Sequence, residues 1–165
     1  MKIGILQTGN APDELIDTTG NFDQMFSTLL GGHGFEFETY AVLDGVFPTG
    51  PDAADGWLIT GSKFGANEDH SWIPPLEDLI RLIEVKGLPL LGICFGHQII
   101  AKALGGIVEK SDGGWVVGRV DYQQNGETLT LNAWHQDQVT KRPEGARVLA
   151  GNSSCANGIL AYGDT

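Results

Sequence analysis

Apolar residues in the first two thirds of the chain fall into short runs, and these runs alternate with stretches that have helical spacing. Two continuous runs, Ile3–Leu6 and Pro89–Ile93, are bounded by turn residues and predict short buried strands. Apolar and polar residues alternate from Phe35 to Tyr40, which also indicates a strand. Trp57–Thr60 is a further expected strand, so that strands are predicted at four places before Cys94.

Helical spacing of apolar residues occurs three times in the same part of the chain. The first stretch is Phe22–Leu30, and the second begins at Pro74, a residue type that is tolerated in the first turn of a helix. The third stretch ends near Leu104, and each of the three is followed by glycine, which commonly ends a helix. The segments 7–19 and 61–72 are expected to be loops.

The pattern changes after residue 106. Strand-like segments follow one another there, and Asn125-Gly126 between the first two is a strong signal for a tight hairpin turn. These segments are 115–122, 127–131, 146–150 and 159–162. The earlier alternation of strand and helix predicts a doubly wound, mostly parallel sheet flanked by helices. We therefore expect residues 1–165 to form a single α/β domain whose C-terminal part is rich in β-hairpins.

The chain carries a formal charge of −11 and has no long run of Lys and Arg. A protein that follows phosphate backbones needs clustered basic residues, so neither nucleic-acid binding nor attraction to anionic lipid is expected. No apolar stretch approaches the roughly 18 residues of a membrane span, and we expect no signal peptide in the first residues. Cys94 and Cys155 lack the spacing of a zinc or redox site, so we expect free thiols in a reducing cytoplasm.

Neither a metal nor a cofactor is expected. Glu68, Asp69 and His70 have side chains that can bind metals, but consecutive residues on a loop rarely present ligand geometry. The chain also lacks the glycine-rich loop that cradles the phosphates of ATP.

The most informative segment joins the strand at Pro89–Ile93 to the helix that follows. Gly92-Ile93-Cys94-Phe95-Gly96 has the Gly-x-Cys-x-Gly pattern of a nucleophile elbow, a sharp turn from strand to helix. Side chains at 92 and 96 would collide with the neighbouring strand and helix. A helix N-terminus favours the thiolate of Cys94, and the N–H of Phe95 would point toward a developing oxyanion. The alternative is that Cys94 is a small buried apolar residue, but the two glycines favour the nucleophile.

The segment Gly92–Gln98 resembles the G-x-C-x-G-x-Q signature of class I (triad) glutamine amidotransferases. Other segments resemble the same family in the same order along the chain: Leu58–Ser62, Asn67–Ile73 and Trp134–Val139. The last of these is similar to the S-H-x-D-x-V stretch of GMP-synthase-type members. The resemblance implies that glutamine is the substrate and that Cys94 attacks its side-chain amide.

The resemblance also implies roles for other residues. The backbone N–H groups of Gly61 and Phe95 would hold the oxyanion, and Ser62 and Gln98 would lie beside the substrate. Helix packing is the alternative role for Gln98. Ammonia would leave, and water would then hydrolyse the γ-glutamyl thioester on Cys94. A synthase partner would receive the ammonia.

The family places its catalytic histidine and glutamate in a late H-P-E motif, which this chain does not contain. The last residues resemble the hairpin before that motif, with Thr165 in its turn, so we expect the natural sequence to continue. His135 and Asp137 have the same spacing as the H-P-E pair and could act as base and orienter. The resemblance instead assigns His135 and Gln136 to a loop that lines the glutamine pocket. Trp134 is expected to be a packing residue.

Three hypotheses about function follow. The first is an enzyme that hydrolyses glutamine and releases ammonia for an unknown acceptor. The second keeps Cys94 as nucleophile and takes a γ-glutamyl peptide or γ-glutamyl amine as substrate. The third is a non-catalytic binding or regulatory module. The first two hypotheses differ in which γ-glutamyl compound releases glutamate, so that measurement distinguishes them.

Overall fold

The structure is a computed structural model that describes residues 1–163, which form two compact units. The first unit is Met1–Ile99, and the second begins at Ile100. The expectation of a turn at Thr165 lies outside the described residues, and the expectation of a single domain stays a prediction.

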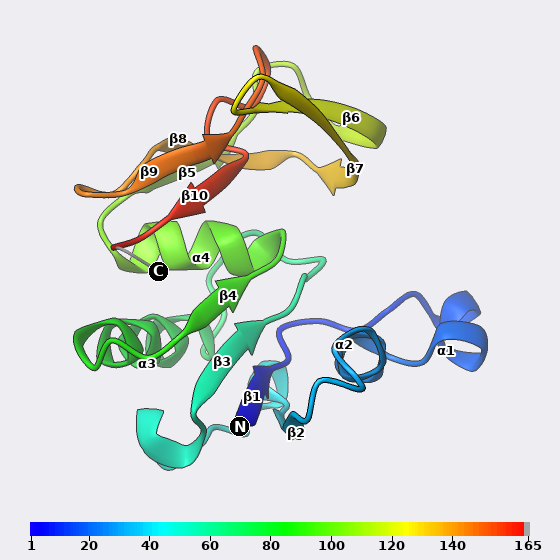
Figure 1. Cartoon of the computed structure of the whole chain (residues 1–165), viewed down its shortest axis with the longest axis vertical. Coiled ribbons are helices and arrows are strands. Elements are labelled where there is room, and N and C mark those ends of the chain that lie inside the picture. The colour runs from blue at the N-terminus through cyan, green and yellow to red at the C-terminus, as the bar shows by residue number, and fades with distance from the viewer. Residues whose placement is uncertain (164–165) are drawn as a thin grey trace. The chain divides into compact units, whose positions relative to one another are not determined.

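The first unit contains a four-stranded sheet in which every pairing is parallel (Figure 1). In spatial order the strands are β2 (Glu36–Tyr40), β1 (Lys2–Leu6), β3 (Gly56–Ile59) and β4 (Leu90–Gly92). The chain moves to one side of β1 to form β2 and to the other side to form β3, so the strand order reverses between β1 and β3. Open α/β sheets bind their ligands at such a switch point, outside the carboxyl ends of the strands.

Helices connect these strands as the apolar pattern predicts. α2 (Phe22–Leu29) precedes β2, α3 (Ile73–Val85) precedes β4, and α4 (Phe95–Ala103) follows β4. Asn21 and Gln24 form a capping box at the start of α2, and the apolar stripe of α3 is buried. Short 3-10 helices lie between β2 and β3, at Val42–Asp44 and Pro51–Ala53. The parallel sheet with flanking helices confirms the predicted fold class.

Two expectations about the first unit are wrong. The pattern predicts a loop at 7–19, but α1 (Asp13–Thr19) lies in this segment. Acidic residues in its first turn favour a helix, but α1 buries no residue and therefore has no apolar stripe that would reveal it. The pattern also predicts that β4 is buried. β4 lies at the edge of the four-stranded sheet instead, and Leu91 is 52% exposed.

Within the described residues, the second unit contains three antiparallel strand pairs. They are β5 (Ile107–Lys110) with β8 (Asp137–Lys141), β6 (Val116–Gln124) with β7 (Glu127–His135), and β9 (Arg147–Ala150) with β10 (Ile159–Ala161). Asn125 and Gly126 join β6 to β7 with positive φ angles of 51° and 86°, as a type I′ turn requires. The predicted hairpin-rich C-terminal part is therefore confirmed.

The sequence pattern does not predict the β5–β8 pair. Each of these strands buries a single residue, Val108 in β5 and Val139 in β8, which leaves no clear alternation to recognise. β7 is longer than predicted and β8 follows closely, so the segment Trp134–Val139 is mostly strand and not the expected loop. Trp134 is 74% exposed, so the expectation that it is a packing residue is also wrong.

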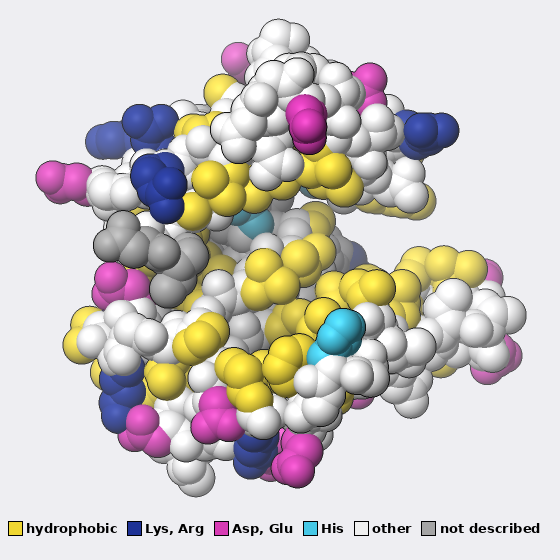
Figure 2. All heavy atoms as spheres, in the orientation of Figure 1, with side chains coloured by type: hydrophobic (Ala, Val, Ile, Leu, Met, Phe, Trp, Pro, Cys, Tyr) yellow, Lys and Arg dark blue, Asp and Glu magenta, His cyan; other side chains and the backbone are white. Residues whose placement is uncertain are grey.

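Hydrophobic side chains reach the surface in several places on the face shown in Figure 2. Across the described residues, the large hydrophobic residues with the greatest exposed fractions are Val85, Trp134 and Leu29. None of the helices in residues 1–163 has the length and apolar character needed to cross a membrane.

Neighbouring residues on α3 provide a test of the packing in the first unit. Ile83 is fully buried, whereas Leu82 is 51% exposed. We expect Ile83→Ala to leave a cavity and to lower the free energy of unfolding by about 2–5 kcal/mol. Leu82→Ala should change it by less than about 0.5 kcal/mol, because about half of that residue is already exposed to water. Urea denaturation measures both values, and equal losses would contradict this assignment of the buried face.

Candidate active site

Cys94 lies on a strained turn between β4 and α4. β4 ends at Gly92, α4 begins at Phe95, and Cys94 between them has a φ of 55°. Positive φ is unfavourable for a residue with a side chain, and such strain is concentrated at functional sites. Among residues 1–163, Cys94 shares this property only with Asn125. The predicted strand-to-helix turn is therefore present. Because Cys94 is exposed, the turn presents its thiol to solvent.

Gly96 allows the first turn of α4 to lie directly against the end of β3. A Cβ atom built at this position would lie 2.4 Å from the carbonyl oxygen of Ile59, much closer than a real Cβ can approach. The predicted collision of a side chain at position 96 with its neighbours is therefore confirmed. Glycine here lets the helix start immediately after the nucleophile, close to the strand.

The end of β3 also brings Gly61 beside Cys94. A Cβ atom built on Gly61 would lie 3.8 Å from the Cβ of Cys94. The N–H of Ile93 donates to the carbonyl of Ile59 over 3.1 Å, which continues the contact between β3 and β4 up to the turn. Among the backbone–backbone hydrogen bonds of the described residues that lie outside regular elements, none has the N–H of Gly61 or Phe95 as donor. Two such donors beside a thiol suit an oxyanion hole, and this assignment stays a prediction.

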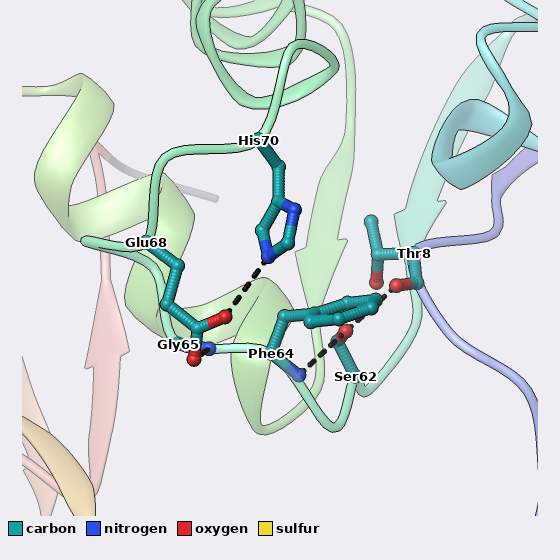
Figure 3. Close-up of polar contacts among 6 residues, drawn as sticks. All are labelled: Thr8, Ser62, Phe64, Gly65, Glu68 and His70. Carbon is teal, nitrogen blue, oxygen red and sulfur yellow. Dashed lines mark hydrogen bonds and ion pairs between the residues drawn. The ribbon is translucent and has the colours of Figure 1, made fainter.

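Hydrogen bonds between the ends of β1 and β3 fix the backbone next to Gly61. The N–H of buried Thr8 donates to Oγ1 of buried Thr60 over 3.0 Å. The hydroxyl of Ser62 donates to the carbonyl of Thr8 over 2.7 Å and accepts from the N–H of Phe64 over 3.1 Å (Figure 3). Ser62 therefore anchors this loop with its side chain, and its contact with substrate stays a prediction.

The other residues expected beside the substrate lie on α4 and around the end of β7. Gln98 belongs to α4 and is buried. His135 is the last residue of β7, and Gln136 follows it. Nδ1 of His135 donates to the backbone carbonyl of Asp137 over 3.0 Å, because a carbonyl oxygen can only accept. A base and orienter of the triad type would use the Asp137 carboxylate. The substrate contacts of Gln98, His135 and Gln136 stay predictions.

Cys155 has a different environment from Cys94. It is 8% exposed and lies with Tyr122 and Ala150 in a hydrophobic cluster of the second unit. Burial raises the pKa of the Cys155 thiol, which disfavours the reactive thiolate. Cys94 is therefore the better placed of the two thiols to act as a nucleophile.

Sequence reasoning missed the contacts inside the β3–α3 loop, residues 60–72. Oε2 of Glu68 lies 2.9 Å from Nε2 of His70. The His70 ring has its centroid 4.3 Å from that of Phe64 and 5.8 Å from that of Trp72. The Trp72 ring in turn lies 5.6 Å from the ring of Phe95. The signals in the sequence are several aromatic residues in one loop and a histidine two residues after Glu68. Within the described residues, no three His, Cys, Asp or Glu side chains are grouped as a metal site would require.

The chain is similar to known proteins along most of its sequence. The sequence model of the family described as "Glutamine amidotransferase class-I" matches residues 51–161. The chain is 36% identical over 152 residues to gamma-glutamyl peptidase 4 of Arabidopsis thaliana, an alignment that covers 82% of this chain and 61% of that protein. It is 31% identical over 159 residues to gamma-glutamyl peptidase 2 of the same plant, covering 88% of this chain and 64% of the relative.

A solved structure of a glutamine amido transferase from Methylobacillus flagellatus superposes with a TM-score of 0.82 at 25% identity. The superposition covers 98% of this chain and 65% of that one, so the chain spans somewhat less than two thirds of these proteins' lengths. The family match extends over more than half of the sequence and includes the elbow. The chain therefore belongs to the class I glutamine amidotransferase family, whose members are cysteine-dependent amidohydrolases, as its resemblance at Gly92–Gln98 predicts.

Proposed function

We propose that this chain carries the nucleophile and oxyanion site of a hydrolase that cleaves a γ-glutamyl amide bond through a thioester on Cys94. The observation that carries the proposal is the position of an exposed cysteine at positive φ on a strand-to-helix turn, with Gly61 beside it. This geometry favours a catalytic role over a non-catalytic binding module. A cysteine with only a structural role would not need the strained turn.

A γ-glutamyl peptide is the substrate class that we favour. Glutamine and γ-glutamyl peptides share the γ-glutamyl group and differ in the amine that leaves, so one site could act on either. The similarity to two gamma-glutamyl peptidases, at 36% and 31% identity, supports the peptide. Glutamine hydrolysis with delivery of ammonia to a synthase partner is the second candidate, and the likeness to a glutamine amido transferase structure supports it.

The chemistry begins with attack of the Cys94 thiolate on the γ-carbonyl carbon. The C–O double bond opens to an oxyanion, toward which the N–H groups of Gly61 and Phe95 would donate. The tetrahedral intermediate collapses, the C–N bond breaks, and the amine leaves with the proton that the thiol gave up when it became a thiolate. Water then adds to the thioester, and collapse of the second intermediate releases glutamate and restores the thiol of Cys94.

Two groups of residues are candidates for recognition of the γ-glutamyl group. One lies near the carboxyl ends of the strands, and the other matches positions that line the substrate pocket in the family. We propose that Gly61 and Ser62 contact it through the backbone of their loop, and that Gln98, His135 and Gln136 contribute polar groups. The family resemblance gives the proton shuttle to a histidine followed by Pro-Glu. His135 with Asp137 is the alternative within this chain.

The nucleophile can be tested with matched substrates and variants. We expect release of glutamate from a γ-glutamyl dipeptide to exceed that from glutamine by at least about tenfold, and an α-glutamyl dipeptide to be inert. Cys94→Ala should abolish release because no other exposed thiol was found, while Cys155→Ala should retain it. Mass mapping after treatment with diazo-oxo-norleucine should place the adduct on Cys94. An adduct on Cys155, or release that survives Cys94→Ala, would rule out this mechanism. Faster release from glutamine would favour the second candidate.

The proposed oxyanion donor can be tested at Gly61 with two substitutions, of which only one keeps the backbone N–H. Alanine keeps the backbone N–H, and its Cβ would make an ordinary 3.8 Å contact with the Cβ of Cys94. Proline removes the N–H. We expect Gly61→Pro to lower kcat/KM by about 10²–10³ more than Gly61→Ala does, since removal of one oxyanion donor typically has that cost. Steady-state kinetics measure the ratio, with thermal unfolding as the check on folding. Equal kinetic losses would argue against a donor at Gly61.

A further inference from the structure

We infer that Glu68 is a positioning residue for the oxyanion site. Its carboxylate holds the β3–α3 loop in the shape that keeps Gly61 beside Cys94 and Trp72 against Phe95. The inference rests on the proposed function, because it concerns the same site. It assigns Glu68 no contact with substrate.

The β3–α3 loop contains one proposed oxyanion donor near its start and contacts the residue of the other donor at its end. Gly61, at the start of the loop, is adjacent to Cys94. Trp72, at its end, packs against the ring of Phe95 with 5.6 Å between centroids, and both of these aromatic residues are buried. The shape of this one loop therefore affects the position of both N–H groups.

Glu68 bridges two points of the loop with one carboxylate (Figure 3). Oε1 accepts the backbone N–H of Gly65 over 2.9 Å, and Oε2 lies 2.9 Å from Nε2 of His70. These bonds close the loop on itself on either side of Glu68. A carboxylate that bonds a backbone N–H fixes the path of the main chain as well as that of a side chain.

Ring contacts carry this restraint to both ends of the loop. The His70 ring is stacked on Trp72, with 13° between their planes, and Trp72 contacts Phe95. On the other side the His70 ring lies against Phe64, whose N–H donates to the hydroxyl of Ser62 next to Gly61. A continuous set of contacts therefore runs from Glu68 to the neighbours of both proposed donors.

The exposure of the pair indicates what this restraint contributes. The side chains of Glu68 and His70 are 52% and 30% exposed, and ion pairs that face water add little to stability. The reaction rate is far more sensitive to the geometry of the reacting centre, since a misplacement of about 1 Å can reduce the rate about 10²-fold. Loss of Glu68 should therefore lower the rate while stability changes little.

The test compares Glu68→Ala with Glu68→Gln in the full-length natural protein. Glutamine keeps an oxygen that can accept from Gly65 N–H and an amide N–H that can donate to His70. We expect Glu68→Ala to lower kcat for a γ-glutamyl dipeptide roughly tenfold to hundredfold, with KM within about threefold. Glu68→Gln should restore kcat to within about threefold of the natural protein. Asp78→Ala is the control, because Asp78 is an exposed acid on α3 that pairs with Arg81 at 2.6 Å.

Hydrogen exchange provides a readout that does not depend on activity. The N–H of Gly65 should exchange faster in Glu68→Ala than in the natural protein, with protection retained in Glu68→Gln and in Asp78→Ala. If the natural protein cleaves no γ-glutamyl compound, the proposed function fails, and the exchange rates alone judge the role of Glu68. Unchanged exchange in Glu68→Ala would overturn the inference. So would an unchanged kcat, or a rise in KM alone, which would indicate contact with substrate.

Discussion

The turn at Cys94 is the constraint on which the rest of the site depends. A residue with a side chain does not adopt a φ of 55° readily on its own, so the surrounding structure has to hold it there. The parallel ladder between β3 and β4 restrains the turn on one side. The close approach of Gly96 to the carbonyl of Ile59 restrains it on the other. Because both restraints use the end of β3, and Gly61 follows that strand directly, the thiol and Gly61 are held by the same strand.

The topology of the sheet explains why other polar groups collect near this turn. The strand order reverses between β1 and β3, so the segments that follow these strands lead away in different directions. Thr8 after β1 and Ser62 after β3 bond across this point and join the two segments at their base. The β3–α3 loop therefore starts from a fixed position. Beyond Ser62, its path depends on contacts within the loop and on the packing of Trp72 against Phe95.

The sequence predicts the elements whose apolar pattern is strong and misses those whose pattern is weak. α3 is predictable because its buried residues recur at helical spacing. α1 buries nothing and β5 buries one residue, so neither has a period to detect. β4 illustrates a different limit. A continuous apolar run indicates a strand, but the position of that strand in the sheet depends on the whole topology, and at the edge Leu91 is left exposed.

The same distinction applies to the site. The elbow can be recognised from sequence because its requirements are local, with the steric demands lying within two residues of Cys94. A glutamate two residues before a histidine is ambiguous in sequence, since it suits a metal site, a solvated ion pair or a loop restraint equally well. The distances favour the loop restraint, because the Glu68 carboxylate bonds Gly65 N–H and the His70 ring, which belong to the same loop. The reacting atom can thus be inferred from local spacing, whereas the groups that fix its surroundings depend on how the loop folds back on itself.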